Sequence, residues 1–497
     1  MKNTKKLFAL VLSIIMIMSL ATTAFAASIT IDDGAITGAT YQAYKLLNAT
    51  DGGDGKYAYT VNTKYASVLE SVTGETTDAG VVAYIDDVEN INAFANAVYA
   101  AIVKAGLEED YETTTNEFTD VDQGYYLIVE TALGTTETGA TDTYSLLMLD
   151  TAGNETVTVK TKEDLPTVEK KVEEVNDSTG DTSWGDSADY DVDDVINYEI
   201  TGTVSNKYES YKSYYYSFSD TMDAGLTLNA DSIKIMIGDV DVTSQFTIET
   251  TEHSFTATAN LKELTGVTIT GDTEIIVTYT ATLNENAVSG STGNKNKVTL
   301  DYENNPSHEG DGDPETPDEP EKPGKTPEDV NIVFTYDVVV DKVHKTGEDE
   351  NGNPVYGALE GAGFTLYKWD AEENDWVAVG DEITDVTTFE FKKLDEGKYK
   401  LVETTVPAGY NKAADVEFEI VSTLEGTELT ALTVTPADSF TVTLKSGKIE
   451  TDVVNNAGAE LPETGGIGTT IFYTLGGILV LAAVILLVTK KRMAKEA

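Results

Sequence analysis

The chain has 497 residues, of which 86 are acidic and 33 basic, and its formal net charge at pH 7 is −53. That excess of acid argues against nucleic acid as a partner, because phosphate binding needs a surplus of lysine and arginine. The chain has no cysteine, so disulfides are excluded, and either the cores alone or another covalent link must stabilise a secreted fold.

The first residues have the pattern of a secretory signal peptide. Three lysines precede an apolar run over residues 7–20, and Ala24-Phe25-Ala26 supplies the small-x-small pattern of a signal peptidase site. We predict a signal peptide over residues 1–26 with cleavage after Ala26, and therefore a secreted protein.

Short alternating segments rich in Tyr, Thr and Val recur between clusters of Gly, Asn and Asp. Residues 214–219, 274–283 and 387–391 are examples. This pattern predicts an all-β protein of tandem immunoglobulin-like β-sandwich domains. The exception is residues 88–105, where apolar residues recur at helical spacing and predict one helix in the first domain.

Composition divides the chain into domains. Residues 306–330 are rich in Pro, Glu, Asp and Gly, which predicts an acidic linker or a long surface loop. A second boundary falls near Asp164, where one strand-like run ends and another begins. We therefore predict an N-terminal domain over 27–163, a middle domain over 164–305 and a C-terminal domain over 331–457.

A lysine lies on the apolar face of the predicted first strand in two of these domains. Period-2 alternation places Lys170 on the same face as Val168 and Val172, and it places Lys342 on the same face as Val340. A buried lysine is costly unless it is neutralised or paired, so each of these lysines needs a partner.

The end of the chain combines three features. A pentapeptide is followed by an apolar stretch over 467–488, long enough to span a bilayer, and then by a basic triplet. The pentapeptide reads Leu461-Pro462-Glu463-Thr464-Gly465. Residues 461–497 thus resemble the cell-wall sorting signal of Gram-positive surface proteins. The resemblance implies that a sortase cleaves after Thr464 and passes its carbonyl to an amine.

The C-terminal domain resembles a Cna B-type β-sandwich. Its segment 399–410 is similar to the E-box of sortase-assembled pilins, and Val453-Val454-Asn455 closes the domain. That family forms spontaneous Lys–Asn isopeptide bonds. The resemblance implies a bond between Lys342 and Asn455, assisted by Glu403.

The chemistry of such a bond explains the residue types. Burial lowers the pKa of a lysine and leaves a neutral, nucleophilic amine. Burial also raises the pKa of a carboxyl group, which can then polarise the asparagine carbonyl and move protons. The amine attacks, ammonia leaves, and an amide links the two strands.

The middle domain repeats the pattern. Segments 215–220 and 294–302 resemble the acid-bearing strand and the last strand of the middle domain of these pilins. The resemblance implies a bond between Lys170 and Asn296, assisted by Asp220. Lys171 and Asn294 remain alternatives, because the sequence does not fix the register.

The N-terminal domain offers weaker candidates. Lys45 lies in a strand candidate, and Glu130 lies in an alternating segment that parallels the E-box. Asn154 is the one candidate for a closing asparagine. We favour a domain without an isopeptide bond and keep Lys45 with Glu130 as the alternative.

Residues 157–162, Val-Thr-Val-Lys-Thr-Lys, are similar to the pilin motif Val-x-Val-Tyr-Pro-Lys, with Lys-Thr in place of Tyr-Pro. The resemblance implies that Lys162 accepts Thr464 of the next subunit, and Lys160 is the second candidate. The chain as a whole resembles the major shaft subunit of a wall-anchored pilus that supports adhesion, and it is not expected to be an enzyme with turnover.

The implied partners are a pilus-specific sortase, a housekeeping sortase with peptidoglycan, identical subunits and minor pilins; no cofactor and no host ligand is implied. A wall-anchored adhesin or minor pilin is the alternative.

No metal site is predicted. Asp349, Asn351 and Asn353 have the spacing of a calcium loop, but Pro354 takes the glycine position, which favours a hairpin turn. The acidic run 191–194 is interpreted as solvated surface.

Overall fold

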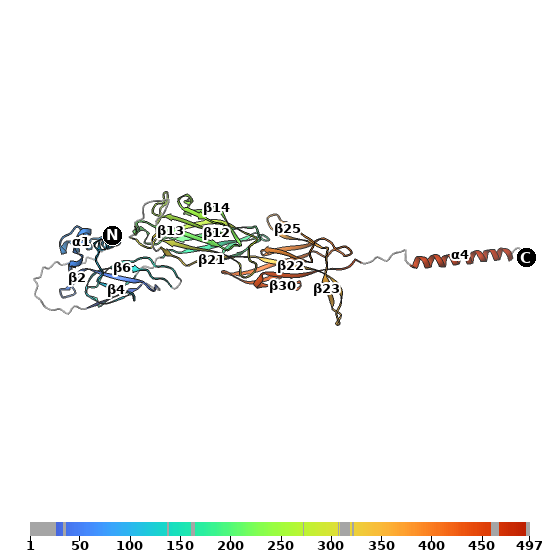
Figure 1. The fold of residues 1–497 in the computed structure, drawn as a ribbon, viewed down its shortest axis with the longest axis horizontal. Helices are drawn as coiled ribbons and strands as arrows, with labels where there is room; N and C mark the ends of the chain where they lie inside the picture. The colour runs from blue at the N-terminus through green and yellow to red at the C-terminus, as the bar shows by residue number, and fades with distance from the viewer. Residues whose placement is uncertain are drawn as a thin grey trace, which may run out of the picture.

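Three β-rich domains lie in a row along the molecule (Figure 1). The computed structural model describes residues 26–32, 36–136, 139–160, 165–271, 273–306, 308, 319–320, 323–458 and 467–493. Within these residues, six sheets and four hydrophobic cores make up the three domains. The predicted all-β class, with tandem sandwich domains, is confirmed.

The N-terminal domain packs two sheets against each other and a layer of helices against the larger sheet. The strand orders are β5-β1-β8 and β3-β2-β6-β7, with β4 beside β2. The strands are β1 (Ala27–Asp32), β2 (Thr40–Asp51), β3 (Tyr57–Val61), β4 (Tyr111–Thr113), β5 (Glu117–Val121), β6 (Gly124–Ala132), β7 (Leu146–Asp150) and β8 (Thr156–Lys160).

The helical layer contains η1 (Thr63–Tyr65), α1 (Ala66–Thr73), α2 (Asp78–Asp86) and α3 (Ile91–Ala105). Asn90 caps α3 by accepting from the Ala93 amide at 3.0 Å, and Gly106 ends it in the left-handed region. The predicted helix is therefore confirmed as α3. The shorter α1 and α2 were not anticipated, because eight or nine residues give too little periodicity to stand out.

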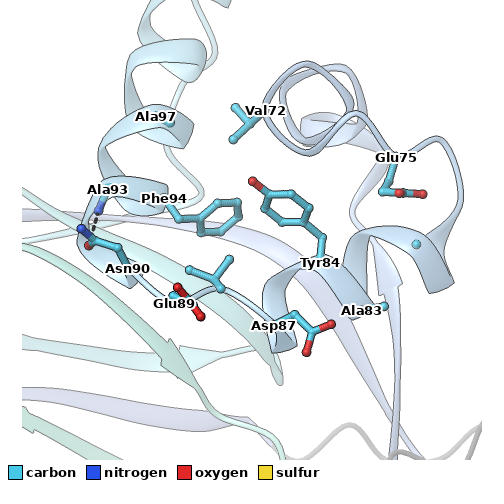
Figure 2. A pocket seen from close by; sticks show the side chains of 12 residues that line it. Val72, Glu75, Ala83, Tyr84, Asp87, Glu89, Asn90, Ala93, Phe94 and Ala97 are labelled. Carbon is cyan, nitrogen blue, oxygen red and sulfur yellow. Dashed lines mark hydrogen bonds between the residues drawn. The ribbon is translucent and has the colours of Figure 1, made fainter.

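A hollow of ≈ 670 Å³ lies between α1, α2 and α3 (Figure 2). Tyr84 and Phe94 meet in it with ring centroids 5.9 Å apart, and Val72 and Asp87 also line it. None of the residues that the sequence singles out as functional lines this hollow.

The middle domain is a sandwich of two sheets around one core. Its first sheet has the order β10-β9-β12-β18-β14-β15, with β9 (Val168–Asn176), β10 (Asp181–Gly185), β12 (Val195–Thr203), β14 (Leu226–Ile237), β15 (Val240–Asp241) and β18 (Glu274–Leu283). The second sheet has the order β11-β21-β19-β13-β17-β16, and β20 pairs with β19 outside this path. Its strands are β11 (Ser187–Asp189), β13 (Tyr215–Met222), β16 (Thr247–Thr250), β17 (Ser254–Asn260), β19 (Asn294–Tyr302), β20 (Gly324–Lys325) and β21 (Asp329–Phe334). Short turns η2 (Tyr208–Ser210) and η3 (Thr243–Gln245) connect these strands.

The C-terminal domain is a second sandwich. One sheet has the order β23-β22-β31-β30 with β26 beside β22, and its strands are β22 (Tyr336–Glu348), β23 (Pro354–Ala358), β26 (Thr388–Leu394), β30 (Phe440–Thr443) and β31 (Lys448–Asn455). The other has the order β25-β24-β27-β28-β29, with β24 (Gly363–Asp370), β25 (Asp375–Ile383), β27 (Gly397–Thr405), β28 (Val416–Glu425) and β29 (Glu428–Thr435). The turns η4 (Ala437–Ser439) and η5 (Leu444–Ser446) flank β30.

The boundary between the middle and C-terminal domains differs from the prediction. Strand β21 pairs with β19 in a sheet of the middle sandwich, while its Ile332 and Phe334 side chains pack into the core of the C-terminal sandwich. The first strand within the C-terminal sheets begins at Tyr336 rather than at residue 331. The Pro-rich segment is therefore an excursion between two paired strands of the middle domain, because the apolar residues that follow it complete that sheet.

The turn at residues 349–353 and the C-terminal tail bear on two further predictions. Residues 349–353 form the predicted hairpin turn between β22 and β23, with Gly352 in the left-handed region. Helix α4 (Ile467–Met493) covers the predicted membrane span. In the part of the chain that the structure describes, no helix meets the length and hydropathy required for crossing a membrane.

Candidate functional site: two buried lysine–acid–asparagine clusters

The first cluster lies in the core of the middle domain. Lys170 is the third residue of β9 in one sheet, whereas Asp220 on β13 and Asn296 on β19 belong to the facing sheet. All three side chains are buried, with residue exposures of 0–1%. Each occupies an inward position of an alternating strand, so the fold brings together the three residues that the sequence predicted.

The contacts of this cluster converge on a fourth residue, Tyr279 of β18. Lys170 Nζ donates to Asp220 Oδ2 and to the Tyr279 hydroxyl. Asn296 Nδ2 donates to the same hydroxyl at 2.9 Å, and the hydroxyl donates to Asp220 Oδ2 at 3.1 Å. Within the described residues, Asp220 Oδ1 and Asn296 Oδ1 have no hydrogen-bond partner.

Sequence reasoning missed Tyr279. The signal was available, because alternation on β18 places this tyrosine on the same inward face as Val277 and Ala281. A buried tyrosine hydroxyl needs a hydrogen-bond partner, so a tyrosine on an apolar face indicates a polar group opposite.

The surroundings of Lys170 favour its neutral form. Burial lowers the pKa of Lys170, and the opposing effect of Asp220 does not restore it. Burial likewise raises the pKa of Asp220. The rings of Tyr198 and Tyr279 stand 5.1 and 5.0 Å from the Lys170 nitrogen, so aromatic rings and not water surround the amine. A neutral amine beside a protonated acid is the arrangement that amide formation requires.

The alternative residues of the middle domain lie elsewhere. Lys171 is partly exposed and pairs with Asp186 at 2.7 Å. Asn294 is buried, but its side chain binds Val288 and the Val333 carbonyl. The geometry therefore favours Lys170 and Asn296 over these neighbours.

The second cluster lies in the C-terminal domain. Lys342 on β22 and Asn455 on β31 lie on neighbouring parallel strands of one sheet, and Glu403 reaches them from β27 of the facing sheet. Lys342 Nζ donates to Asn455 Oδ1 at 2.5 Å and lies 3.0 Å from Glu403 Oε1. Asn455 Nδ2 donates to the same Glu403 oxygen at 2.8 Å. The predicted trio is again buried and in mutual contact.

The second cluster also favours a neutral amine. Burial lowers the pKa of Lys342, against the opposing effect of Glu403. The Phe364 ring lies 5.2 Å from the amine, and the Ala413 amide donates to Glu403 Oε2 at 2.6 Å. The backbone thus holds the carboxyl group between the two residues that would react.

The N-terminal candidates are not brought together. The Lys45 ammonium pairs with Asp122 at 2.9 Å, at a partly exposed position. Glu130 is buried and accepts from the Ser145 amide at 3.2 Å. Asn154 lies exposed in a turn, where it binds the Ala152 carbonyl. The Lys45–Glu130 alternative is therefore not supported, because the lysine is directed to a surface carboxylate.

The residues predicted for polymerisation are only partly described. Lys160 ends β8, with its side chain 78% exposed and its ammonium 3.2 Å from Asp32. It lines a hollow of ≈ 460 Å³ between the N-terminal and middle domains. Lys162 and the pentapeptide 461–465 lie outside the described residues. The predicted cleavage point after Ala26 falls directly before β1.

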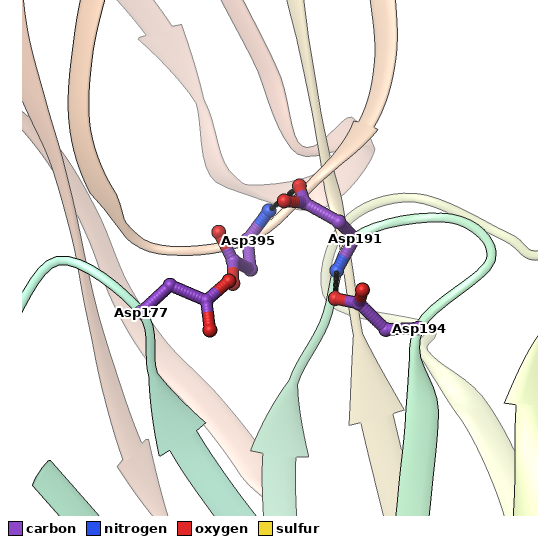
Figure 3. Close-up of side chains that lie close together, drawn as sticks. All are labelled: Asp177, Asp191, Asp194 and Asp395. Carbon is purple, nitrogen blue, oxygen red and sulfur yellow. Dashed lines mark hydrogen bonds between the residues drawn. The ribbon is translucent and has the colours of Figure 1, made fainter. Parts of the chain in front are cut away.

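A third polar cluster joins the middle and C-terminal domains (Figure 3). The Lys368 ammonium of β24 contacts Asp177 at 2.7 Å, Asp191 at 2.8 Å and Asp395 at 2.6 Å. Burial lowers the pKa of Lys368, but the three carboxylates outweigh that effect and raise it. Asp194 lies in the same group of carboxylates.

This junction corrects one prediction. Asp191 and Asp194 were interpreted as solvated surface, but both are partly buried where the two sandwiches meet. Burial raises the pKa of Asp194 to about 7, and the nearby Asp191 adds to that shift. The sequence could not reveal this, because Lys368 approaches from a different domain.

Three protein-family models match this chain. A model described as Gram-positive pilin backbone subunit 2, Cna-B-like domain, matches residues 192–306. A prealbumin-like fold domain, SpaA, matches residues 341–435, and an LPXTG cell wall anchor motif matches residues 453–495. The resemblance to backbone pilins is thereby confirmed, and the anchor motif indicates a protein of the cell wall surface.

Individual proteins are similar to this chain. The trypsin-resistant surface T6 protein of Streptococcus pyogenes is 25% identical over 402 residues, which cover 67% of this chain and 70% of that protein. The solved T6 backbone pilin of S. pyogenes matches with a TM-score of 0.54 at 18% identity, over 87% of this chain and 98% of that one. The full-length major pilin SpaD of Corynebacterium diphtheriae gives a TM-score of 0.46 at 19% identity, over 88% of this chain and 100% of that one.

Proposed function

We propose that this chain, which carries the domains of a Gram-positive backbone pilin and an LPXTG wall anchor, is the major shaft subunit of a covalently polymerised pilus. A sortase would join Thr464 of one subunit to a lysine of the next, with Lys162 favoured over Lys160. The chain itself would be a structural protein and sortase substrate, and the completed pilus would support adhesion.

One observation carries the proposal. Two successive sandwiches each hold a lysine, a carboxyl group and an asparagine close together and shielded from water. In the C-terminal domain the three side chains touch directly, and in the middle domain the Tyr279 hydroxyl connects Asn296 to Lys170 and Asp220. Burying unsatisfied or charged groups is expensive, and a pair of apolar residues would stabilise the core more cheaply. Conversion to an amide with loss of ammonia removes that cost, so we infer Lys170–Asn296 and Lys342–Asn455 isopeptide bonds.

The C-terminal bond would shorten the path of a pulling force. Force enters the domain at the start of β22 and leaves after Asn455, the last residue of β31. With Lys342 joined to Asn455, only residues 336–342 and Asn455 lie in that path. The rest of the sandwich would carry no load, which is what a shaft under tension needs.

The middle bond would act between sheets. It would join the start of β9 in one sheet to β19 in the other, so the two layers could not separate. The Asp329 carboxylate accepts from the Lys170 amide at 2.6 Å, and Asn331 Nδ2 donates to the Lys170 carbonyl at 3.0 Å. Strand β21 thereby supports β9 next to the point of attachment.

The position of the candidate acceptor lysines suits entry of another subunit. Lys160 lies at the rim of the hollow between the N-terminal and middle domains, and Lys162 follows it by two residues. If the next subunit attaches here, force passes through the middle and C-terminal domains. Those are the two domains that hold the buried clusters.

Polymer formation in a Gram-positive host with a pilus sortase tests this proposal. We expect the chain to form high-mass covalent ladders, and we expect Thr464→Ala and the double variant Lys160→Ala/Lys162→Ala to abolish them. Lys104→Ala, an exposed lysine in the last turn of α3, is the matched control and should leave the ladders unchanged. A wild-type chain found only as wall-anchored monomer would contradict the shaft function and favour an adhesin or minor pilin.

A further inference from the structure

We propose that Tyr279 is a catalytic residue of the middle-domain isopeptide reaction, in which its hydroxyl passes the proton released by Lys170 to the departing nitrogen of Asn296. This inference rests on the proposed function, because it assumes that the Lys170–Asn296 bond forms. The observation behind it is that the Tyr279 hydroxyl contacts both reacting side chains, Lys170 and Asn296, and also the acid Asp220.

The two clusters differ in what reaches the leaving nitrogen. In the C-terminal domain Glu403 Oε1 lies 3.0 Å from Lys342 Nζ and 2.8 Å from Asn455 Nδ2. One carboxyl oxygen therefore contacts both the nitrogen that releases the proton, Nζ, and the nitrogen that receives it, Nδ2. In the middle domain Asp220 touches Lys170, but Asn296 Nδ2 donates to Tyr279. Aspartate is one methylene shorter than glutamate, and here the phenol, not the acid, is the group that the leaving nitrogen contacts.

The step balances without an added reactant. The neutral Lys170 amine attacks Asn296 Cγ, so the Nζ–Cγ bond forms and the nitrogen becomes positively charged. That nitrogen gives a proton to the Asp220 carboxyl group, Tyr279 takes a proton from Asp220, and Tyr279 gives its own hydroxyl proton to Nδ2. The Cγ–Nδ2 bond then breaks and ammonia leaves, with Tyr279 and Asp220 back in their starting states.

Packing fixes the hydroxyl in this position. Tyr279 stacks on Tyr198 with centroids 5.2 Å apart and an interplanar angle of 10°, and it meets Phe255 edge-on at 5.0 Å. Burial raises the pKa of Tyr279 well above its ordinary value, so the phenol stays protonated and can donate. A preorganised donor loses little entropy when the reaction begins.

Tyr279→Phe keeps the ring stack and removes the hydroxyl, so it isolates the proposed role. The full-length chain is sampled at intervals after a pulse of expression, and ammonia loss is assigned to each domain by tryptic mapping and mass spectrometry. We expect the middle bond to form about 100-fold more slowly or more in the variant, the usual scale of a lost general acid. The C-terminal bond in the same molecule should form at the wild-type rate and reports that the chain folds.

Two further variants separate catalysis from packing. Tyr208→Phe removes a buried hydroxyl that binds the Leu261 carbonyl in the same domain, and it should not slow the bond. Asp220→Glu placed in the Tyr279→Phe background extends the acid toward Asn296 and should restore part of the rate. A wild-type rate in Tyr279→Phe, or equal slowing by Tyr208→Phe, would overturn the inference. Absence of the middle bond from the wild-type chain would instead show that the proposed function fails at this site.

Discussion

The middle and C-terminal clusters use the same three kinds of residue in two different geometries. In the middle domain the lysine and the asparagine come from facing sheets, and the acid belongs to the asparagine's sheet. In the C-terminal domain the lysine and the asparagine lie on adjacent parallel strands, and the acid comes from the facing sheet. A buried lysine–acid–asparagine contact is therefore not tied to one strand arrangement.

The difference has a mechanical consequence. The C-terminal bond would connect the first strand of the sandwich to its last strand, so the load path is covalent throughout. In the middle domain β21 follows Asn296 and is held to β19 by hydrogen bonds. Residues 297–334 thus lie between the covalent bond and the next domain, and only noncovalent contacts, strand pairing and core packing, keep them from extending.

The largest predicted effect is on extension under force. In single-molecule stretching, the wild-type C-terminal domain should not lengthen. The middle domain should lengthen by at most about 130 Å, the extended length of residues 297–334. Asn455→Ala should free residues 343–454 and add on the order of 400 Å. Asn331→Ala, a buried asparagine outside the trio, is the control and should add no such step. A wild-type C-terminal domain that unfolds fully would refute the covalent path.

The next effect concerns the reach of the acid. Glu403→Asp withdraws the carboxyl group by one methylene from Asn455 Nδ2, and no tyrosine hydroxyl contacts that nitrogen among the described residues. We expect formation of the C-terminal bond to slow by about 10- to 100-fold, and the middle bond to be unaffected. Mass spectrometry over time measures both bonds in one molecule. An unchanged C-terminal rate would mean that acid length does not distinguish the clusters.

The smallest predicted effect lies at the junction between the two sandwiches. Burial raises the pKa of Asp194 to about 7, so its charged form destabilises the folded state above that pH. This cost disappears as the pH falls through 7 towards the unfolded value near 4. Asp194→Asn should therefore stabilise the protein by about 1 kcal/mol at pH 8, a value reduced for solvent screening, and by roughly a third of that at pH 5, because pH 5 lies about one unit above the unfolded pKa and two units below the folded one.

Thermal unfolding at the two pH values measures the effect of Asp194→Asn. The mutated amide can still accept from the Asp191 amide, as Asp194 Oδ2 does at 3.0 Å, so the loop geometry is kept. Equal stabilisation at pH 5 and pH 8 would show that the charge of Asp194 is not responsible.

The strand pattern was enough to predict the class of fold and to single out one lysine in each of two domains. Lys170 and Lys342 stand out because alternation places a cation on an apolar face, and this depends only on neighbouring residues. The partners Asp220 and Glu403 came from resemblance of their strands to known pilins, and the structure brings them to the two lysines.

Other features depend on contacts between segments far apart in the chain. The sequence did not place β21 in the middle sheet, because a long Pro-rich excursion separates it from β19. It did not indicate the Lys368 junction, where carboxylates of two domains meet one lysine. Tyr279 was missed because alternation places it on the inward face of β18 but does not show which polar groups of the facing sheet its hydroxyl meets.

The intact mass of the secreted chain, with tryptic mapping, shows whether both isopeptide bonds form. We expect the wild type to lack two molecules of ammonia relative to its sequence, with Lys170 joined to Asn296 and Lys342 joined to Asn455. Asp220→Ala should restore the first ammonia only, and Glu403→Ala the second only. A wild-type mass equal to that of the unmodified sequence would exclude both bonds and leave the two clusters as buried hydrogen-bond networks.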